Sequence, residues 1–136
     1  MQAYLGIKYY EDCSNRLIIE QICALLESHG YETSCIIRDM EKWGLEEFPP
    51  ADLMKATFKE INSSNLVLVE VSEKGVGLGI EAGYAYAKGI PVVGIAKKGS
   101  DISNTMLGIL TQVIMYENLE DIEKMFVGNT YIEIGN

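Results

Sequence analysis

The segment from residue 66 to residue 91 constrains the fold of this chain more than any other. It starts with an apolar run rich in β-branched residues, Leu-Val-Leu-Val-Glu-Val, and continues through a loop that contains Gly75, Gly77 and Gly79. A stretch of small residues follows and stops at Gly89. This order predicts a strand, a turn and a helix. In an open parallel sheet such a turn lies at the carboxyl edge, where ligands bind.

The same alternation of strand and helix patterns runs along the whole chain. We predict strands over residues 3–7, 31–37, 66–71, 91–96 and 112–116, and helices over residues 14–30, 51–63, 76–89, 103–110 and 118–126. This alternation indicates an α/β fold: a Rossmann-like, flavodoxin-type three-layer sandwich around a five-stranded parallel sheet of order 2-1-3-4-5. We expect residues 1–136 to form one domain, with residues 130–134 as an edge strand or a tail.

The amino-acid composition of the chain argues against some classes of binding partner. Twenty acidic residues against eleven basic ones give a net charge of −9, which argues against a nucleic acid polymer or an anionic membrane as the main partner. Three cysteines without paired spacing indicate neither a disulfide framework nor a zinc site. The first residues show no cationic stretch followed by an apolar core. These features together predict a cytoplasmic protein.

Glu81 is the carboxylate nearest the predicted turn. If the helix begins near residues 76–79, Glu81 lies in its first turn, where free N–H groups and the helix dipole favour the ionised form. A carboxylate held there is a candidate nucleophile. The alternative is that Glu is simply a favourable first-turn residue. The glycine spacing matches neither the dinucleotide fingerprint nor a phosphate-binding loop, so neither NAD binding nor nucleoside triphosphate hydrolysis is predicted.

The run Gly-Val-Gly-Leu-Gly-Ile-Glu-Ala-Gly-Tyr-Ala-Tyr-Ala-Lys-Gly-Ile-Pro resembles the signature of the nucleoside 2-deoxyribosyltransferase superfamily, including its 2′-deoxynucleoside 5′-monophosphate N-glycosidase branch. The resemblance extends over residues 4–108, although only this run is specific. It implies that Glu81 attacks the anomeric carbon of a nucleoside or nucleoside 5′-monophosphate. It also implies a reaction without a metal or organic cofactor.

The resemblance implies two further groups of substrate-binding residues. The loop after the first strand and the glycine-rich turn surround the substrate, which assigns Gly6, Ile7, Lys8, Tyr9, Gly75, Gly77 and Gly79. The segment from Ser103 to Gly108 resembles the one that binds the 5′-phosphate across a dimer interface, which assigns Ser103, Asn104 and Met106 and predicts a homodimer or a higher oligomer. Free N–H groups and a hydroxyl at a helix start suit an anion, although Ser103 can equally be a simple N-cap.

The chain departs from this family in three places. Tyr9 and Tyr10 replace the small residues usual in the loop after the first strand. Thr57 stands where the N-glycosidase branch has an Asp, 24 positions before the nucleophile, and Asn65 replaces an Asp common before the third strand. Thr57, Glu60 and Glu70 are the candidates to replace the missing acid. Glu70 ends the third strand and matches a Glu of the hydrolases, but it can instead be a residue that orients the loop.

Several aromatic residues allow two interpretations. Tyr9 and Tyr10 either stack on a base or lie at a surface, and Trp43 and Phe48 either cover a ligand or anchor their loop to the core. His29 is the only histidine, and its place in the last turn of a helix favours a structural role.

We therefore predict an N-glycosidase or deoxyribosyltransferase with Glu81 as the nucleophile. The first alternative is a nucleotide-binding sensor domain that retained the pocket without turnover, which Thr57 and Asn65 favour. The second is an interaction domain without a small ligand.

Overall fold

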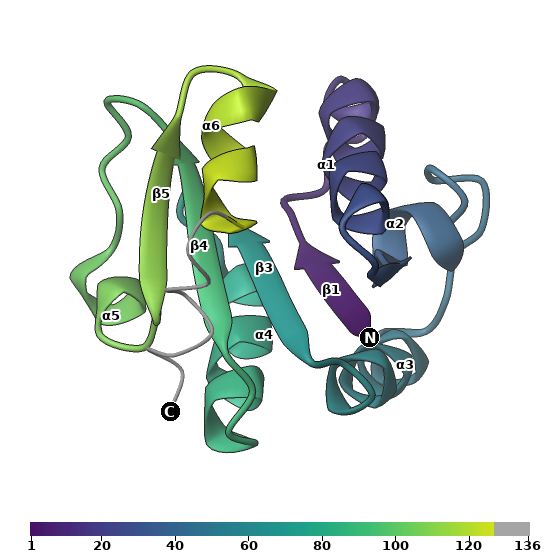
Figure 1. Cartoon of the computed structure of the whole chain (residues 1–136). Helices are drawn as coiled ribbons and strands as arrows, with labels where there is room; N and C mark the ends of the chain where they lie inside the picture. Colours follow the sequence, from purple (N-terminus) through teal and green to yellow (C-terminus); the bar gives the residue numbers. More distant parts are fainter. Residues whose placement is uncertain (127–136) are drawn as a thin grey trace.

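The computed structural model describes residues 1–126. Its sheet contains β1 (Gln2–Gly6), β2 (Glu32–Ser34), β3 (Leu66–Glu70), β4 (Val92–Lys97) and β5 (Gln112–Tyr116). All four pairings are parallel and the order is β2-β1-β3-β4-β5, which confirms the predicted class and strand order (Figure 1).

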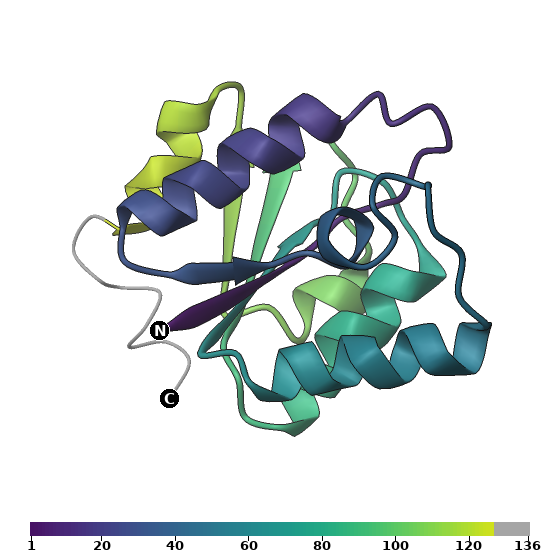
Figure 2. The same ribbon diagram turned by 90° about the vertical axis from the view of Figure 1, so that its right-hand side faces the viewer.

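Helices cover both faces of the sheet and give the predicted three layers (Figure 2). One face carries α1 (Arg16–Ser28) and α6 (Leu119–Glu123), which the 3-10 turn η1 (Lys124–Phe126) follows. The other face carries α3 (Pro50–Asn62) and α4 (Val76–Ala87), with α5 (Asn104–Leu107) beside α4. The short helix α2 (Ile36–Asp39) follows β2.

Strand β3 shows how the sequence builds this sandwich. Leu66 and Leu68 pack in the core beneath α1 and α6, whereas Val67 and Val69 pack in the core beneath α3 and α4. Successive side chains of a strand point to opposite faces, so an unbroken apolar run suits a strand that is covered on both sides. By the same alternation Glu70, the buried last residue of β3, faces the α1 and α6 side.

Some predicted boundaries were wrong. The second strand ends at Ser34 instead of residue 37, because Ile36 already opens α2. Helix α1 starts at Arg16, after Asn15, instead of at residue 14, and the Asp12 carboxylate accepts the Ser14 N–H at 3.0 Å. Helix α5 ends at Leu107, three residues earlier than predicted.

The long loop after α2 is anchored to the core by Trp43. Its ring packs against the core on the α1 side, with the Arg16 guanidinium 4.5 Å from the ring centroid. The Cys13 thiol lies 3.2 Å from the Trp43 carbonyl oxygen. Of the two interpretations of Trp43, this packing supports the structural one.

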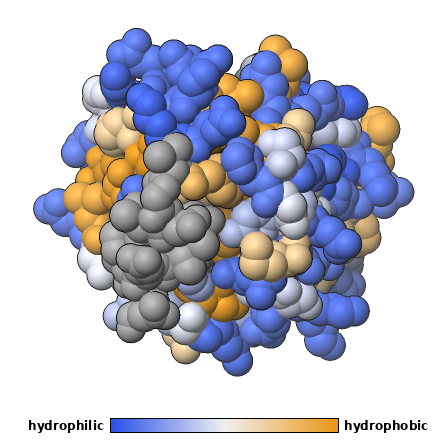
Figure 3. Space-filling view, in the orientation of Figure 1, coloured by the Kyte–Doolittle hydropathy of each residue, from blue (hydrophilic) through white to orange (hydrophobic). Residues whose placement is uncertain are grey.

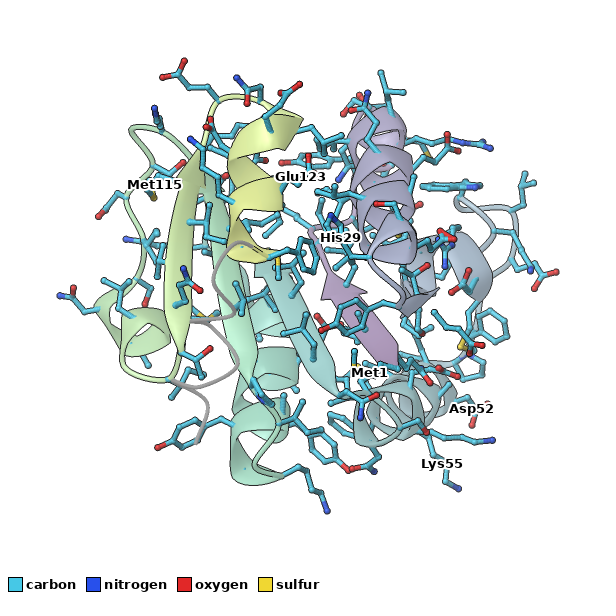
Figure 4. All side chains as sticks on the ribbon, viewed as in Figure 1. Met1, His29, Asp52, Lys55, Met115 and Glu123 are labelled. Atoms are coloured by element: carbon cyan, nitrogen blue, oxygen red, sulfur yellow. The ribbon has the colours of Figure 1, made fainter. Side chains whose placement is uncertain are left out.

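His29 also has a structural environment, as its helix-end position indicated. Its ring stacks on Phe126 with centroids 3.9 Å apart, and Nε2 lies 3.4 Å from Oε1 of Glu123 (Figure 4). These contacts join the end of α1 to α6 and η1.

Strand β5 and helix α6 lie where the sequence predicts a strand and a helix. Asn118 caps α6, since its side chain accepts the Asp121 N–H at 3.1 Å. Strand β5 is only partly buried, and hydrophobic side chains reach the surface on this side of the sheet (Figure 3). Across residues 1–126, none of the helices combines the length and hydrophobicity needed to span a bilayer. The element predicted at residues 130–134 lies outside the described residues.

Candidate active site

The Glu81 carboxylate is held at the carboxyl edge of the sheet by β1. Its Oε1 accepts a 2.7 Å hydrogen bond from the hydroxyl of Tyr4, a fully buried residue of β1. Burial and the neighbouring Glu81 carboxylate raise the pKa of Tyr4, so its hydroxyl keeps its proton and acts as a donor. The strand therefore fixes the orientation of the carboxylate.

Gly6 provides the space that the second carboxylate oxygen needs. A β-carbon built at Gly6 would lie 2.7 Å from Oε2 of Glu81 and 3.3 Å from Cγ1 of Val69. Such a distance to Oε2 is shorter than real contacts allow, so any side chain at residue 6 would displace Glu81 or the strand. Gly6 is predicted to bind substrate, and in the structure it leaves room for the Glu81 carboxylate.

The protonation of Glu81 differs from the expectation. Helix α4 begins at Val76, which places Glu81 in its second turn and not in its first. Burial is the larger effect and raises the pKa of Glu81 to about 7, while the hydrogen bond from Tyr4 acts in the opposite direction. The predicted preference for the ionised form was therefore wrong, because desolvation outweighs the helix start.

A cavity of about 330 Å³ opens over Glu81 and gathers most of the predicted site. We call it the Glu81 cavity. Its lining comes from the end of β1, from α2 and the turn after it, and from α3 and α4. The predicted residues that line it are Ile7, Lys8, Tyr9, Thr57, Gly75 and Gly77. The other side chains are mostly apolar, and they include Ile36, Leu53, Met54 and Leu78.

Thr57 lies at the base of this cavity. It is buried, and its hydroxyl donates to the backbone carbonyl of Leu53 at 2.8 Å. The hydroxyl proton is therefore already engaged within α3 and points toward no ligand. The residue shares the cavity with Glu81 but cannot supply the acid that an Asp would supply.

Glu70 lies on the opposite face of the sheet. Its carboxylate accepts hydrogen bonds from the Ser72 N–H at 2.7 Å, from the Ser72 hydroxyl at 2.9 Å and from the Tyr116 hydroxyl. A different cavity contains it, so it does not meet Glu81. Of its two interpretations, these bonds support a role in orienting the loop between β3 and α4.

The predicted phosphate segment lines a neighbouring cavity of about 420 Å³. Ser103, Met106 and Gly79 contribute to it, and it shares Gly75 and Leu78 with the Glu81 cavity. Ser103 is the residue before α5, yet its side chain makes no capping hydrogen bond. Asn104 is exposed and lines neither cavity.

The remaining acidic candidates also lie elsewhere. Glu60 accepts a 3.1 Å hydrogen bond from Gln2 Nε2, and Asn65 accepts the Gln2 N–H at 2.8 Å, both near the start of β1. Asp52 is exposed on the outer side of α3 (Figure 4). Among the described residues no group of three or more His, Cys, Asp or Glu could hold a metal ion.

Tyr4 and Glu41 are among the residues of the Glu81 cavity that sequence reasoning missed, and both carry polar oxygen atoms. A signal for Tyr4 was available, because a tyrosine within a buried strand needs a partner for its hydroxyl. Glu41 belongs to a loop that has no periodic pattern, so no signal in the sequence pointed to it.

No family model matches the chain, and no curated protein matches it. The 2-deoxyribosyltransferase of Bacillus psychrosaccharolyticus matches in structure with a TM-score of 0.76 at 15% identity, over 96% of each chain. The CMP N-glycosidase BcmB of Clostridium botulinum matches with a TM-score of 0.67 at 16% identity, over 91% of this chain and 96% of that chain. The chain has the fold of these two enzymes.

The fold alone does not decide the chemistry. The flavoenzyme FerB of Paracoccus denitrificans, an NAD(P)H:acceptor oxidoreductase, also matches, with a TM-score of 0.53 at 14% identity over 98% of this chain and 97% of that chain. Function has to be argued from the side chains of the cavity. In this chain those side chains centre on Glu81.

Proposed function

We propose that this chain cleaves the N-glycosidic bond of a nucleoside or a nucleoside 5′-monophosphate, as an N-glycosidase or a deoxyribosyltransferase. The observation that carries the proposal is the Glu81 carboxylate, which is bonded to Tyr4 and opens on a cavity at the carboxyl edge of the sheet. A cavity of about 330 Å³ is at the small end of the range for ligand pockets and suits a nucleoside.

Glu81 acts as the nucleophile in this mechanism. One carboxylate oxygen attacks C1′ through an oxocarbenium-like transition state while the bond from C1′ to the base breaks. The resulting glycosyl-enzyme is resolved by water in a hydrolase or by a second base in a transferase. The hydrogen bond from Tyr4 holds the carboxylate in one orientation, which reduces the cost of reaching the reactive geometry.

A sensor domain is the second candidate, and Thr57 is the observation that favours it. Its hydroxyl donates to the Leu53 carbonyl, so this position has no acid that could protonate a leaving base. A chain of this kind would bind the nucleotide in the same cavity and release it unchanged.

The deciding experiment measures free base released from a panel of nucleosides and their 5′-monophosphates, with wild type and Glu81→Ala compared side by side. Thermal unfolding in the presence of each compound reports binding separately, because a ligand that binds only the folded state raises its stability. Release by wild type that is lost in the variant supports the enzyme. Binding to both proteins without release supports the sensor.

We also propose that the chain works as a homodimer in which Ser103 completes the partner's site. Ser103 lines a cavity that adjoins the Glu81 cavity, and the exposed apolar residues Val76 and Leu107 lie on the same elements, α4 and α5. Apolar residues around a pocket are typical of a surface that another chain covers. Sedimentation at micromolar concentration tests the assembly.

A further inference from the structure

The proposed reaction needs a proton donor that the site as described lacks. A purine or pyrimidine leaves poorly as an anion, so an acid that protonates the base speeds its departure. Thr57 cannot serve, because an alcohol is a very weak acid and this hydroxyl already donates to Leu53. The inference that follows rests on the proposed function.

Two carboxyl groups line the Glu81 cavity within residues 1–126, those of Glu81 and Glu41. The other acidic residues near the carboxyl edge are bonded to other groups. Glu70 lies on the opposite face of the sheet, and Glu73 is exposed and paired with Lys8 at 3.1 Å. Among the described residues, Glu41 is therefore the one remaining acidic residue that can meet a ligand in contact with Glu81.

The backbone of Glu41 is fixed although it belongs to a loop. Its N–H donates to the Ile36 carbonyl at 3.0 Å, which ties it to the end of α2. Its own carbonyl accepts the N–H groups of Gly44 at 2.9 Å and Glu46 at 3.0 Å. A position held on both sides in this way can present a side chain to the cavity reproducibly.

The turn after Glu41 is strained. Lys42 and Trp43 have φ values of 49° and 59°, and Gly44 follows with 89°, so three successive residues adopt the left-handed region. Side chains on the first two positions make this conformation costly, and such strain persists only where the surroundings enforce it. Trp43 packs against the core and Arg16, and this packing holds the turn in its conformation.

The surroundings of the Glu41 side chain are those expected of a proton donor. The residue is partly buried, and among the described residues its carboxyl group has no hydrogen bond or ion pair. Tyr9, which also lines the cavity, lies beside the same turn, because a β-carbon at Gly44 would be 2.9 Å from its hydroxyl. Burial raises the pKa of Glu41, which favours the protonated form.

We propose that Glu41 is the acid that protonates the leaving base. As the bond from C1′ to the base nitrogen breaks, its electron pair goes to the base, which takes the proton of the Glu41 carboxyl group. The Glu81 oxygen forms the new bond to C1′. In the hydrolytic second step, water attacks C1′, the bond to Glu81 breaks, and the water proton passes to the Glu41 carboxylate. Both carboxyl groups then return to their starting states.

The test compares two leaving groups on wild type, Glu41→Gln and Glu81→Ala. One substrate is the best natural compound of the panel, and the other is a nitrophenyl glycoside with the same sugar and 5′ substituent, whose nitrophenolate leaves without a proton. We expect Glu41→Gln to lower kcat for the natural compound by about 100-fold or more and kcat for the nitrophenyl compound by less than about threefold. Glu81→Ala should lose both activities.

The matched control is Glu46→Gln, which alters an exposed carboxylate of the same loop. Thermal unfolding of each variant shows whether it is folded. Equal losses of Glu41→Gln on both substrates, or no loss on the natural one, would overturn the role of Glu41 while leaving Glu81 as nucleophile. If wild type releases no base at all, the proposed function fails, and the role of Glu41 fails with it.

Discussion

The hydroxyl of Tyr4 on β1 donates a 2.7 Å hydrogen bond to the carboxylate of Glu81 on α4, across 77 residues of sequence. This bond joins the first strand of the sheet to the helix that carries the proposed nucleophile. It lowers the pKa of Glu81 while burial raises it, so the two effects together set the pH at which the carboxylate ionises.

Tyr4→Phe should shift the pH dependence of nitrophenolate release from the nitrophenyl compound, which needs no proton from Glu41. The nucleophile must be ionised, so kcat/KM for this compound should fall as the pH drops through about 7, the pKa of Glu81. Removal of the Tyr4 hydroxyl removes the effect that lowers this pKa, so the acidic limb should move to higher pH. The measurement is kcat/KM between pH 5 and pH 9, and Tyr86→Phe at an exposed tyrosine is the control. An acidic limb at the same pH in Tyr4→Phe would contradict the role of this bond.

Glu81→Gln should stabilise the fold at alkaline pH. The carboxyl pKa is raised from 4.5 to about 7 in the folded state, so the folded protein binds more protons than the unfolded chain between these values. Wild type should therefore lose stability as the pH rises through this window, by about 3 kcal/mol in total. Glutamine keeps an oxygen for Tyr4 and carries no charge.

Urea unfolding at pH 4 and pH 8 measures this effect. The variant should be about 3 kcal/mol more stable than wild type at pH 8 and about equal to it at pH 4. A gain of the same size at both pH values would mean that packing, and not the buried charge, causes the difference.

Gly6→Ala should reduce activity more than it reduces stability. The added β-carbon would lie 2.7 Å from Oε2 of Glu81, so the carboxylate has to move from its bond with Tyr4. We expect kcat to fall by about tenfold or more, since small displacements of a reacting group are costly. The free energy of unfolding should fall by about 1 to 3 kcal/mol.

Gly94→Ala is the matched control for this prediction. Its added β-carbon would lie 2.6 Å from Cδ1 of Leu110, so it strains the same sheet away from Glu81. A comparable loss of stability with unchanged kcat is expected. If both variants lose activity in proportion to stability, Gly6 has no particular relation to the nucleophile.

The fold could be predicted from the sequence because its signals are local and repeated. The apolar run of β3, the glycines that end helices and the regular alternation of elements each act over a few residues. The second strand was the exception. Residues 31–37 are apolar enough for a strand, but Ile36 and Ile37 belong to α2 and are buried as residues of that helix. Burial alone does not distinguish a short helix from a strand.

The site was harder to predict, because its geometry depends on the face of the sheet or helix on which each side chain lies. Glu81 was found through a continuous motif. Glu70 was proposed because it matches a Glu of the hydrolases that the chain resembles, and it lies on the other face of the sheet. The protonation of Glu81 depends on burial by residues distant in sequence. Glu41 reaches the cavity through a strained turn that composition does not reveal.

The dimer proposal can be tested by mixing two variants that fail for different reasons. Glu81→Ala removes the nucleophile, and Ser103→Ala removes the proposed phosphate contact of the partner's site. In an equal mixture that exchanges subunits, half of the dimers contain one chain of each kind. One of their two sites then combines Glu81 from one chain with Ser103 from the other, so about a quarter of all sites are intact.

The readout is base release from a 5′-monophosphate at a concentration well below KM. Each variant alone should be slow, and the mixture should recover toward about a quarter of the wild-type rate as subunits exchange. A nucleoside without the phosphate should show no loss in Ser103→Ala, because the hydroxyl has no group to bind. A mixture no faster than the average of the two variants would mean that each site is built from a single chain. Ser103 would then serve only its own subunit, where it lines the cavity next to that of Glu81.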